Sequence, residues 1–150
     1  AQAVVQMCPF LSEIDLGYMC SGVQCNADAL LLLAGGLPNL AKIRAVFRSD
    51  CSPSWAVTSL AQKMQGRLRE LRMECGGTRE TTSDAFVNDT CMECLAACCP
   101  GLRVLAVHNN PDGYEHNKDV LCGDGMRSVV AKCSQLEELE LGLTTRLPLG

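Results

Sequence analysis

The stretch LRVLAV, residues 102–107, decides the fold, because its pattern of apolar and polar positions occurs five times along the 150-residue chain. The pattern is an aliphatic residue, two variable residues, an aliphatic residue, one variable residue and a final apolar residue. Successive copies are separated by 29, 28, 34 and 34 residues, and they begin at Leu11, Leu40, Leu68, Leu102 and Leu136. Repeat periods of about 20 to 50 residues are typical of proteins built by stacking similar units.

Each copy is predicted to be a strand, because its last three residues alternate between apolar and polar. In four of the five units, a pair of apolar residues such as Leu95-Ala96 lies seven and six positions before the first leucine, and a further apolar residue lies ten before. These offsets share one face of a helix. Proline or glycine follows the helix pattern, as at Pro38 and Pro100. Each unit is therefore predicted to be helix, turn, strand and loop, with strands near 13–16, 42–46, 70–74, 104–108 and 138–141.

Cysteine precedes the first leucine by three residues in three copies, at Cys8, Cys99 and Cys133. With the strings CPGLRVL at 99–105 and SQLEELEL at 134–141, this spacing resembles the cysteine-containing subtype of leucine-rich repeats. That subtype is typical of F-box leucine-rich proteins and resembles the ribonuclease-inhibitor-like solenoids. The resemblance covers nearly the whole chain. It implies an α/β leucine-rich repeat solenoid, a horseshoe segment with parallel strands on the concave face and helices on the convex face.

Length and composition predict one domain over residues 1–150, with about five partial or complete repeats. Because the sequence opens inside a helix pattern and ends soon after a strand pattern, we expect it to be a fragment of a longer chain. Thirteen basic residues are outnumbered by 17 acidic ones and form no run, so nucleic acid is not expected as a partner. The longest apolar run, residues 29–34, is too short to span a bilayer. No signal-like segment is visible. The expected compartment is intracellular and reducing, either cytoplasm or nucleus.

The 11 cysteines are predicted to be mainly reduced packing thiols. In particular, the repeat register predicts that Cys8, Cys99 and Cys133 are buried and free. A disulfide framework is the first alternative, although the odd count and the lack of a secretory segment oppose it.

A zinc site is the second alternative, because Cys91, Cys94 and Cys98 share one face of a predicted helix and Cys91 to Cys94 is a usual ligand spacing. Cys75 or His108 would have to supply a fourth ligand. No catalytic motif accompanies either histidine, so we expect neither an enzyme nor a cofactor.

Candidate binding residues come from the positions between the buried anchors, which form two ladders across a parallel sheet. The first ladder contains Glu13, Lys42, Glu70, Val104 and Glu138; the second contains Asp15, Arg44, Arg72, Ala106 and Glu140. Arg44 beside Arg72 is a like-charge pair unless a carboxylate intervenes, and an apolar step follows it. We predict a partner-binding patch here, with the loops 76–90 and 109–122 overhanging it. Its residues are Arg44, Arg72, Glu74, Val104, Ala106 and His108.

Two functions are consistent with these patterns. The chain is expected to be a protein–protein interaction module that binds a protein through its concave face and loops. The resemblance implies the substrate-recognition part of an F-box-like ubiquitin ligase receptor. The alternative is a structural or scaffolding subunit of a large intracellular assembly.

Overall fold

The computed structural model describes residues 1–16, 27–47, 53–76, 87–110 and 123–143, in which helices alternate with strands. The helices are α1 (Gln2–Met7), α2 (Ala27–Gly36), α3 (Pro53–Lys63), α4 (Asp89–Cys98) and α5 (Asp124–Lys132). The strands are β1 (Glu13–Leu16), β2 (Lys42–Phe47), β3 (Glu70–Gly76), β4 (Val104–Asn110) and β5 (Glu138–Leu143). Every strand begins at the predicted residue, and β2 to β5 extend one or two residues beyond the predicted ends.

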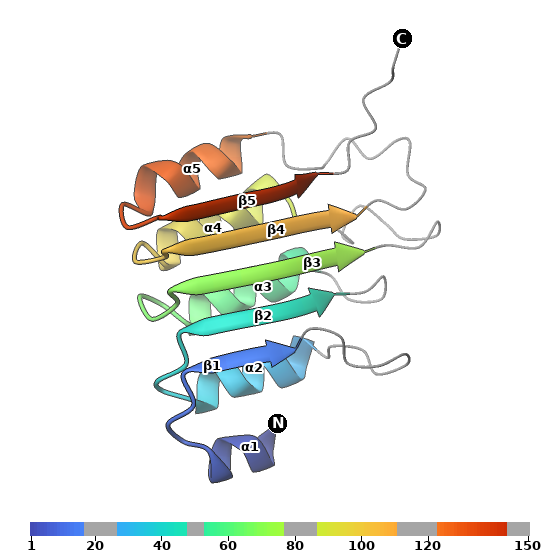
Figure 1. Cartoon of the computed structure of the whole chain (residues 1–150), viewed down its shortest axis with the longest axis vertical. Coiled ribbons are helices and arrows are strands. Elements are labelled where there is room, and N and C mark those ends of the chain that lie inside the picture. The colour runs from blue at the N-terminus through green and yellow to red at the C-terminus, as the bar shows by residue number, and fades with distance from the viewer. Residues whose placement is uncertain (17–26, 48–52, 77–86, 111–122, 144–150) are drawn as a thin grey trace.

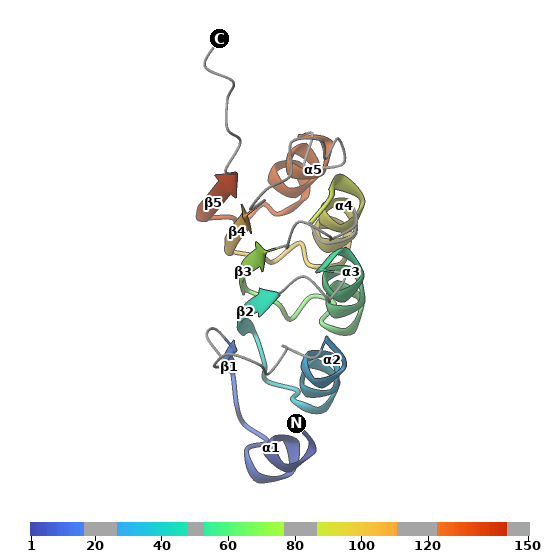
Figure 2. The same cartoon turned by 90° about the vertical axis from the view of Figure 1, so that its right-hand side faces the viewer.

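The strands form one parallel sheet in the order β1-β2-β3-β4-β5. Helices α2 to α5 lie in one layer against one face of this sheet (Figures 1 and 2). No described helix covers the opposite face, which we call the open face. The predicted α/β organisation with parallel strands is thus confirmed, and the curved solenoid stays a prediction.

The core lies between the sheet and the helix layer, because alternate strand residues point toward the helices. In β2, Ile43, Ala45 and Phe47 are each only 1% exposed. Ala45 is small for this position, and Phe47 supplies a large, fully buried side chain two residues later. The helices contribute the facing residues, such as Leu60 and Leu95. Burial of these aliphatic groups provides most of the stabilisation of such a layer.

A recurring turn links each helix to the next strand. The backbone N–H of the first leucine of the repeat donates to the carbonyl three residues earlier, from Leu102 to Cys99 over 3.1 Å and from Leu136 to Cys133 over 3.0 Å. In the third unit Arg67 makes the corresponding bond to Met64, and Gly66 adopts a positive φ of 68°. Glycine is the residue that tolerates this conformation.

The guanidinium of Arg67 caps the carboxyl ends of two helices. Its Nη1 donates to the carbonyl of Leu37 over 2.9 Å, and its Nη2 donates to Ala34 over 2.9 Å and to Lys63 over 3.0 Å. These carbonyls lie at or just beyond the carboxyl ends of α2 and α3, where helices leave acceptors without internal partners. Arg67 therefore ties the second unit to the third.

The prediction for the repeat cysteines is confirmed for two and wrong for one. Cys99 and Cys133 are buried, at 0% and 2% exposure, whereas Cys8 is exposed. Each buried thiol donates to a carbonyl of the preceding unit, from Cys133 to Cys99 over 3.5 Å and from Cys99 to Ala61 over 3.7 Å. Within the described residues, Cys8 belongs to the first unit and has no preceding unit to pack against.

Candidate protein-binding face

The open face carries the two ladders that the sequence predicts. Across β1, β2 and β3 the first ladder pairs Glu13 with Lys42 and then Glu70. The second ladder pairs Asp15 with Arg44 and then Arg72. Register is fixed because the intervening residues of each strand are buried, and a slip of one residue would expose them.

Carboxylates separate the cations in the first half of the face. The Lys42 ammonium lies 3.9 Å from both Glu13 and Glu70. The Arg44 guanidinium lies 3.7 Å from Asp15 and 3.5 Å from Glu74. The like-charge contact that we considered for Arg44 and Arg72 is thus relieved by carboxylates of this chain.

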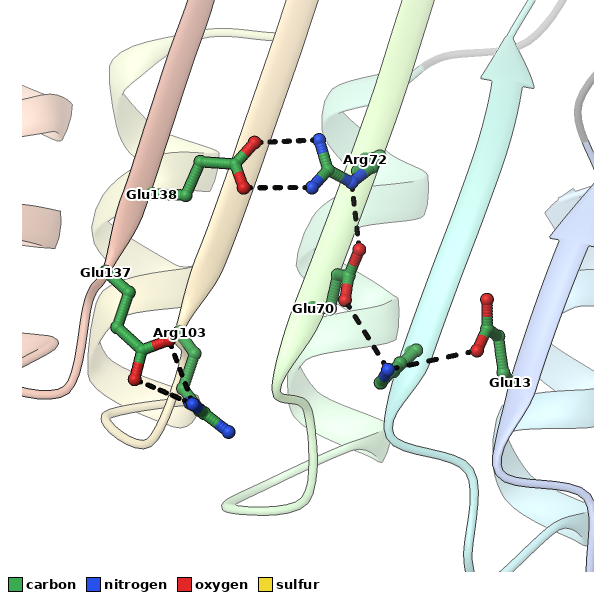
Figure 3. A network of polar contacts seen from close by, with 7 residues as sticks. Glu13, Glu70, Arg72, Arg103, Glu137 and Glu138 are labelled. Atoms are coloured by element: carbon green, nitrogen blue, oxygen red, sulfur yellow. Dashed lines mark hydrogen bonds and ion pairs between the residues drawn. The ribbon is translucent and has the colours of Figure 1, made fainter.

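Arg72 organises the second half of the face. Its Nε donates to Glu70 over 2.8 Å, and its Nη1 and Nη2 donate to the two carboxylate oxygens of Glu138 over 2.9 and 3.1 Å. Glu138 is on β5, so this bidentate pair spans the intervening strand β4 (Figure 3). Nη1 also lies 3.9 Å from Glu140. Hydrogen bonding to Glu138 and then to Glu70 raises the pKa of Arg72, which stays charged.

The side chain of Arg72 changes the prediction that Val104 and Ala106 of β4 form an exposed apolar surface. Ala106, the register neighbour of Arg72, is 2% exposed, and Val104 is half-buried. Ala106 is short, which leaves room for the Arg72 side chain to cross β4. The sequence placed Ala106 on the binding surface, but its own side chain offers almost no area to a partner.

His108 is the predicted patch residue nearest the carboxyl end of β4. Its Nε2 lies 3.4 Å from Glu140, and its side chain is 40% exposed. A Cβ at Gly142 on β5 would collide with the His108 ring. Glycine at this position therefore allows the imidazole to lie toward β5.

The open face has an excess of negative charge. Its described cations are Lys42, Arg44 and Arg72, whereas its carboxylates are Glu13, Asp15, Glu70, Glu74, Glu138 and Glu140. The predicted basic pair is therefore embedded in an acidic surface. The loops 76–90 and 109–122, which we expected to overhang it, lie mostly outside the described residues.

Sequence reasoning did not select Glu138 and Glu70 as part of the patch, although they hold Arg72 in place. It also missed a second bidentate pair beside the sheet. Arg103 directly precedes β4 and Glu137 directly precedes β5 (Figure 3). The Nε of Arg103 donates to one carboxylate oxygen of Glu137 over 3.0 Å, and its Nη2 donates to the two carboxylate oxygens over 2.7 and 2.9 Å. The Arg103–Glu137 pair continues the register of β4 and β5 by one residue, whereas the Arg72–Glu138 pair runs diagonally across β4.

The cysteines of α4 lie away from the open face. Cys91 is buried, and its thiol donates to the carbonyl of Asn88 over 3.1 Å. The sulfur atoms of Cys94 and Cys98 lie 4.0 Å apart and are half-buried. Burial raises the pKa of the Cys94 thiol. His108, considered as a fourth zinc ligand, is instead on the open face beside Glu140. In the described ranges, no group of three or more histidine, cysteine, aspartate or glutamate side chains is arranged to hold a metal ion.

No helix in the described part of the chain combines the length and apolarity needed to cross a membrane. A scan against known protein families finds none that matches this chain, and a search of curated proteins finds no match.

Proposed function

We propose that this chain is a protein-binding module of the leucine-rich repeat type, which binds a basic surface of a protein partner through its open face. The single observation that carries the proposal is the ordered, acidic array of side chains on that face. Three cross-strand ion pairs and the Glu70–Arg72 pair within β3 join Glu13, Lys42, Glu70, Arg72 and Glu138 into one continuous chain (Figure 3). A regular face of this kind suits recognition, because the fold supports it from behind with a packed core.

The ion pairs restrict the rotamers of long side chains before any partner arrives. Ordering a long side chain at an interface typically costs about 0.5–1.5 kcal/mol, so restriction in the free protein favours binding. The excess of carboxylates then selects for lysine and arginine in the partner. Charge complementarity of this type contributes mainly to specificity and association rate.

The test compares carboxylates of equal chemistry on two surfaces. Glu74→Gln with Glu140→Gln removes two open-face charges whose contacts within the chain are long, at 3.4 to 3.9 Å. Glu93→Gln, on the exposed surface of α4, is the matched control. We expect the double variant to retrieve fewer partners from cell extract and to lose the salt dependence of retrieval, with Glu93→Gln unchanged. Loss of partners from Glu93→Gln alone would place binding on the helix layer and reject the proposal.

Within this class, we propose the substrate-recognition part of an F-box-like ubiquitin ligase receptor, on the basis of the cysteine-containing repeat pattern. This role predicts copurification of the full-length protein with cullin-type ligase components. A scaffolding subunit is the second candidate. Exposed leucines on β5, Leu139 and Leu141, favour it, because an apolar sheet end suits a permanent contact. A stoichiometric complex without ligase components would select the scaffold.

A further inference from the structure

The β5 end of the sheet exposes side chains that every inner unit buries. Leu139 and Leu141 are 40% and 38% exposed, whereas their register partners on β4, Leu105 and Val107, are both 0% exposed. Among the described residues, β5 pairs with β4 alone. The two leucines of β5 that face the helix layer are thus exposed where the next strand covers their counterparts on β4.

The helix layer shows the same deficit at this end. Val130 of α5, six residues before the repeat leucine, is 60% exposed, while Ala34 and Ala96 at the equivalent positions are 0% and 1% exposed. The opposite end of the sheet differs, because Ile14 of β1 is only 8% exposed. The exposed apolar surface of the described sheet is therefore concentrated at β5.

The chain itself shows which kind of strand complements this edge. Glu138 and Glu140 of β5 occupy the same positions of the repeat as Glu13 and Asp15 of β1. The neighbour of β1 is β2, which places Lys42 opposite Glu13 and Arg44 opposite Asp15 and inserts apolar residues between them. A strand beside β5 would complement it in the same way, with lysine or arginine outward and aliphatic residues inward.

A second copy of this chain does not fit. Its β1 would bring Glu13 and Asp15 against Glu138 and Glu140, and its β5 would bring the same two glutamates. Like charges directly opposite each other destabilise a strand pair. The edge therefore selects against self-association.

We propose that the outer edge of β5 binds an extended segment of a partner protein in which aliphatic residues alternate with lysine or arginine. Backbone hydrogen bonds to β5 would supply affinity, and side chains would supply specificity, as in other cases of strand addition. The inward aliphatic residues would cover Leu139 and Leu141, and the outward cations would pair with Glu138 and Glu140. This interface is the sheet edge, so it is separate from binding across the open face.

The probe is a peptide of residues 40–47, LAKIRAVF, with a fluorescein label at its N-terminus, and it carries the pattern of β2. Its matched control carries Lys42→Glu and Arg44→Glu. We expect the first peptide to bind the intact chain in fluorescence anisotropy, and the control to bind at least about tenfold more weakly. Hydrogen exchange should then show new protection of β5 amides on peptide binding.

Variants of the chain locate the site. Leu141→Thr replaces a large aliphatic side chain with a smaller, β-branched one that suits a strand, and Glu140→Gln removes the charge of a side chain that is 53% exposed. Each should weaken peptide binding about three- to tenfold. Glu140→Gln keeps the test valid if Leu141→Thr does not fold. The matched control, Glu13→Gln with Asp15→Asn, changes the same chemistry at the opposite edge and should leave binding unchanged.

Four results would overturn the proposal. They are equal binding of both peptides, loss of binding from the β1 control variant, full protection of β5 amides without peptide, and a dimer that Leu141→Thr dissociates. The third result would mean that the chain covers its own edge. The fourth would mean that a second copy does so.

Discussion

The bidentate pair between Arg72 and Glu138 should be worth measurably more than an ordinary surface ion pair. Exposed pairs usually contribute about 0.2–1 kcal/mol, and ideal bidentate geometry or a network places a pair at the upper end. The Arg72 side chain is 33% exposed and Glu138 is 47% exposed, and Arg72 also bonds Glu70. We therefore expect a coupling energy of about 1 kcal/mol from the Arg72→Met and Glu138→Gln double-mutant cycle.

Arg103 and Glu137 provide the matched control cycle. Their contacts are equally short, down to 2.7 Å, but the side chains are 54% and 60% exposed and neither belongs to a described strand. Greater solvent screening should reduce the coupling of this pair to about 0.3–0.5 kcal/mol. Because surface electrostatics are screened by salt, both couplings should shrink at 1 M salt.

The assay is urea unfolding of each variant, followed by circular dichroism. Arg72→Met alone should lower the free energy of unfolding by about 1–2 kcal/mol, since it also leaves Glu70, Glu138 and Glu140 close together without their cation. Equal coupling in the two cycles, or a coupling that does not change with salt, would refute the reasoning from geometry and exposure.

The same geometry alters the expectation for a charge reversal. From sequence, Arg72→Glu is expected to remove a partner contact without unfolding the stack. In the structure, Arg72 lies among Glu70, Glu138 and Glu140, so the reversal would gather four carboxylates. It should cost more stability than Arg72→Met in the same assay. Arg72→Glu is therefore a poor probe of binding alone.

Three further results are expected. Cys8 should react with a thiol reagent in the native protein while Cys99 reacts only after denaturation, as peptide mass spectrometry would report; rapid native labelling of Cys99 would contradict its burial. Burial raises the pKa of the Cys99 thiol from 9.0 to about 12, so the unfolded chain loses this proton first and stability should fall as pH rises from 9 toward 12. Cys99→Ala should flatten that fall in urea titrations at several pH values, and an unchanged slope would contradict the assignment. Arg67→Met should lower the free energy of unfolding by about 2 kcal/mol, because the hydrogen bonds to helix-end carbonyls are lost. Arg67→Lys should restore little of this stability, since an ammonium group cannot reproduce the forked geometry of the guanidinium. Full restoration by lysine would show that charge alone suffices.

The fold could be predicted because each unit repeats one local pattern. The leucine spacing identifies the strands, and the apolar pairs before them identify the helix faces. Strand starts were predicted to the residue, since a turn bond to the carbonyl three residues earlier holds the first leucine, as at Leu102, or in the third unit the residue before it, Arg67. Strand ends were less predictable. They depend on how far neighbouring strands continue to pair, which the pattern of one unit does not contain.

Burial of the cysteines was predictable only where a preceding unit exists. The motif gives Cys8 and Cys133 the same register, yet one is exposed and the other is buried. Position in the stack, rather than residue type, decides this outcome. The same reason explains why Leu139 and Leu141 are exposed at the other end, although they match the buried anchors in sequence.

The sequence predicted which residues of the candidate site are neighbours on adjacent strands, but not which side chains contact each other across an intervening strand. Ladder neighbours follow directly from the alignment of repeats, so the contacts of Arg44 with Asp15 and of Lys42 with Glu13 could be anticipated. The crossing of β4 by Arg72 could not, because it depends on a long side chain passing over a short one. That crossing converts a predicted basic patch into an ion-paired surface with excess negative charge.

Arg72 also links the open face to the β5 edge, because it neutralises the carboxylates that an added strand would use. The carboxylate of Glu138 accepts hydrogen bonds from Nη1 and Nη2 of Arg72, and the carboxylate of Glu140 lies 3.9 Å from Nη1. If the edge binds a basic strand, Arg72 competes with that strand for the same oxygens. Arg72→Met should therefore lower stability but tighten binding of the LAKIRAVF peptide severalfold in anisotropy titrations at low salt. Arg44→Met removes a cation from β2, which lies one strand farther from β5 than the strand of Arg72. This variant should leave the affinity for the peptide unchanged. Weaker binding by Arg72→Met with native circular dichroism would show that Arg72 supports the edge rather than competing for it.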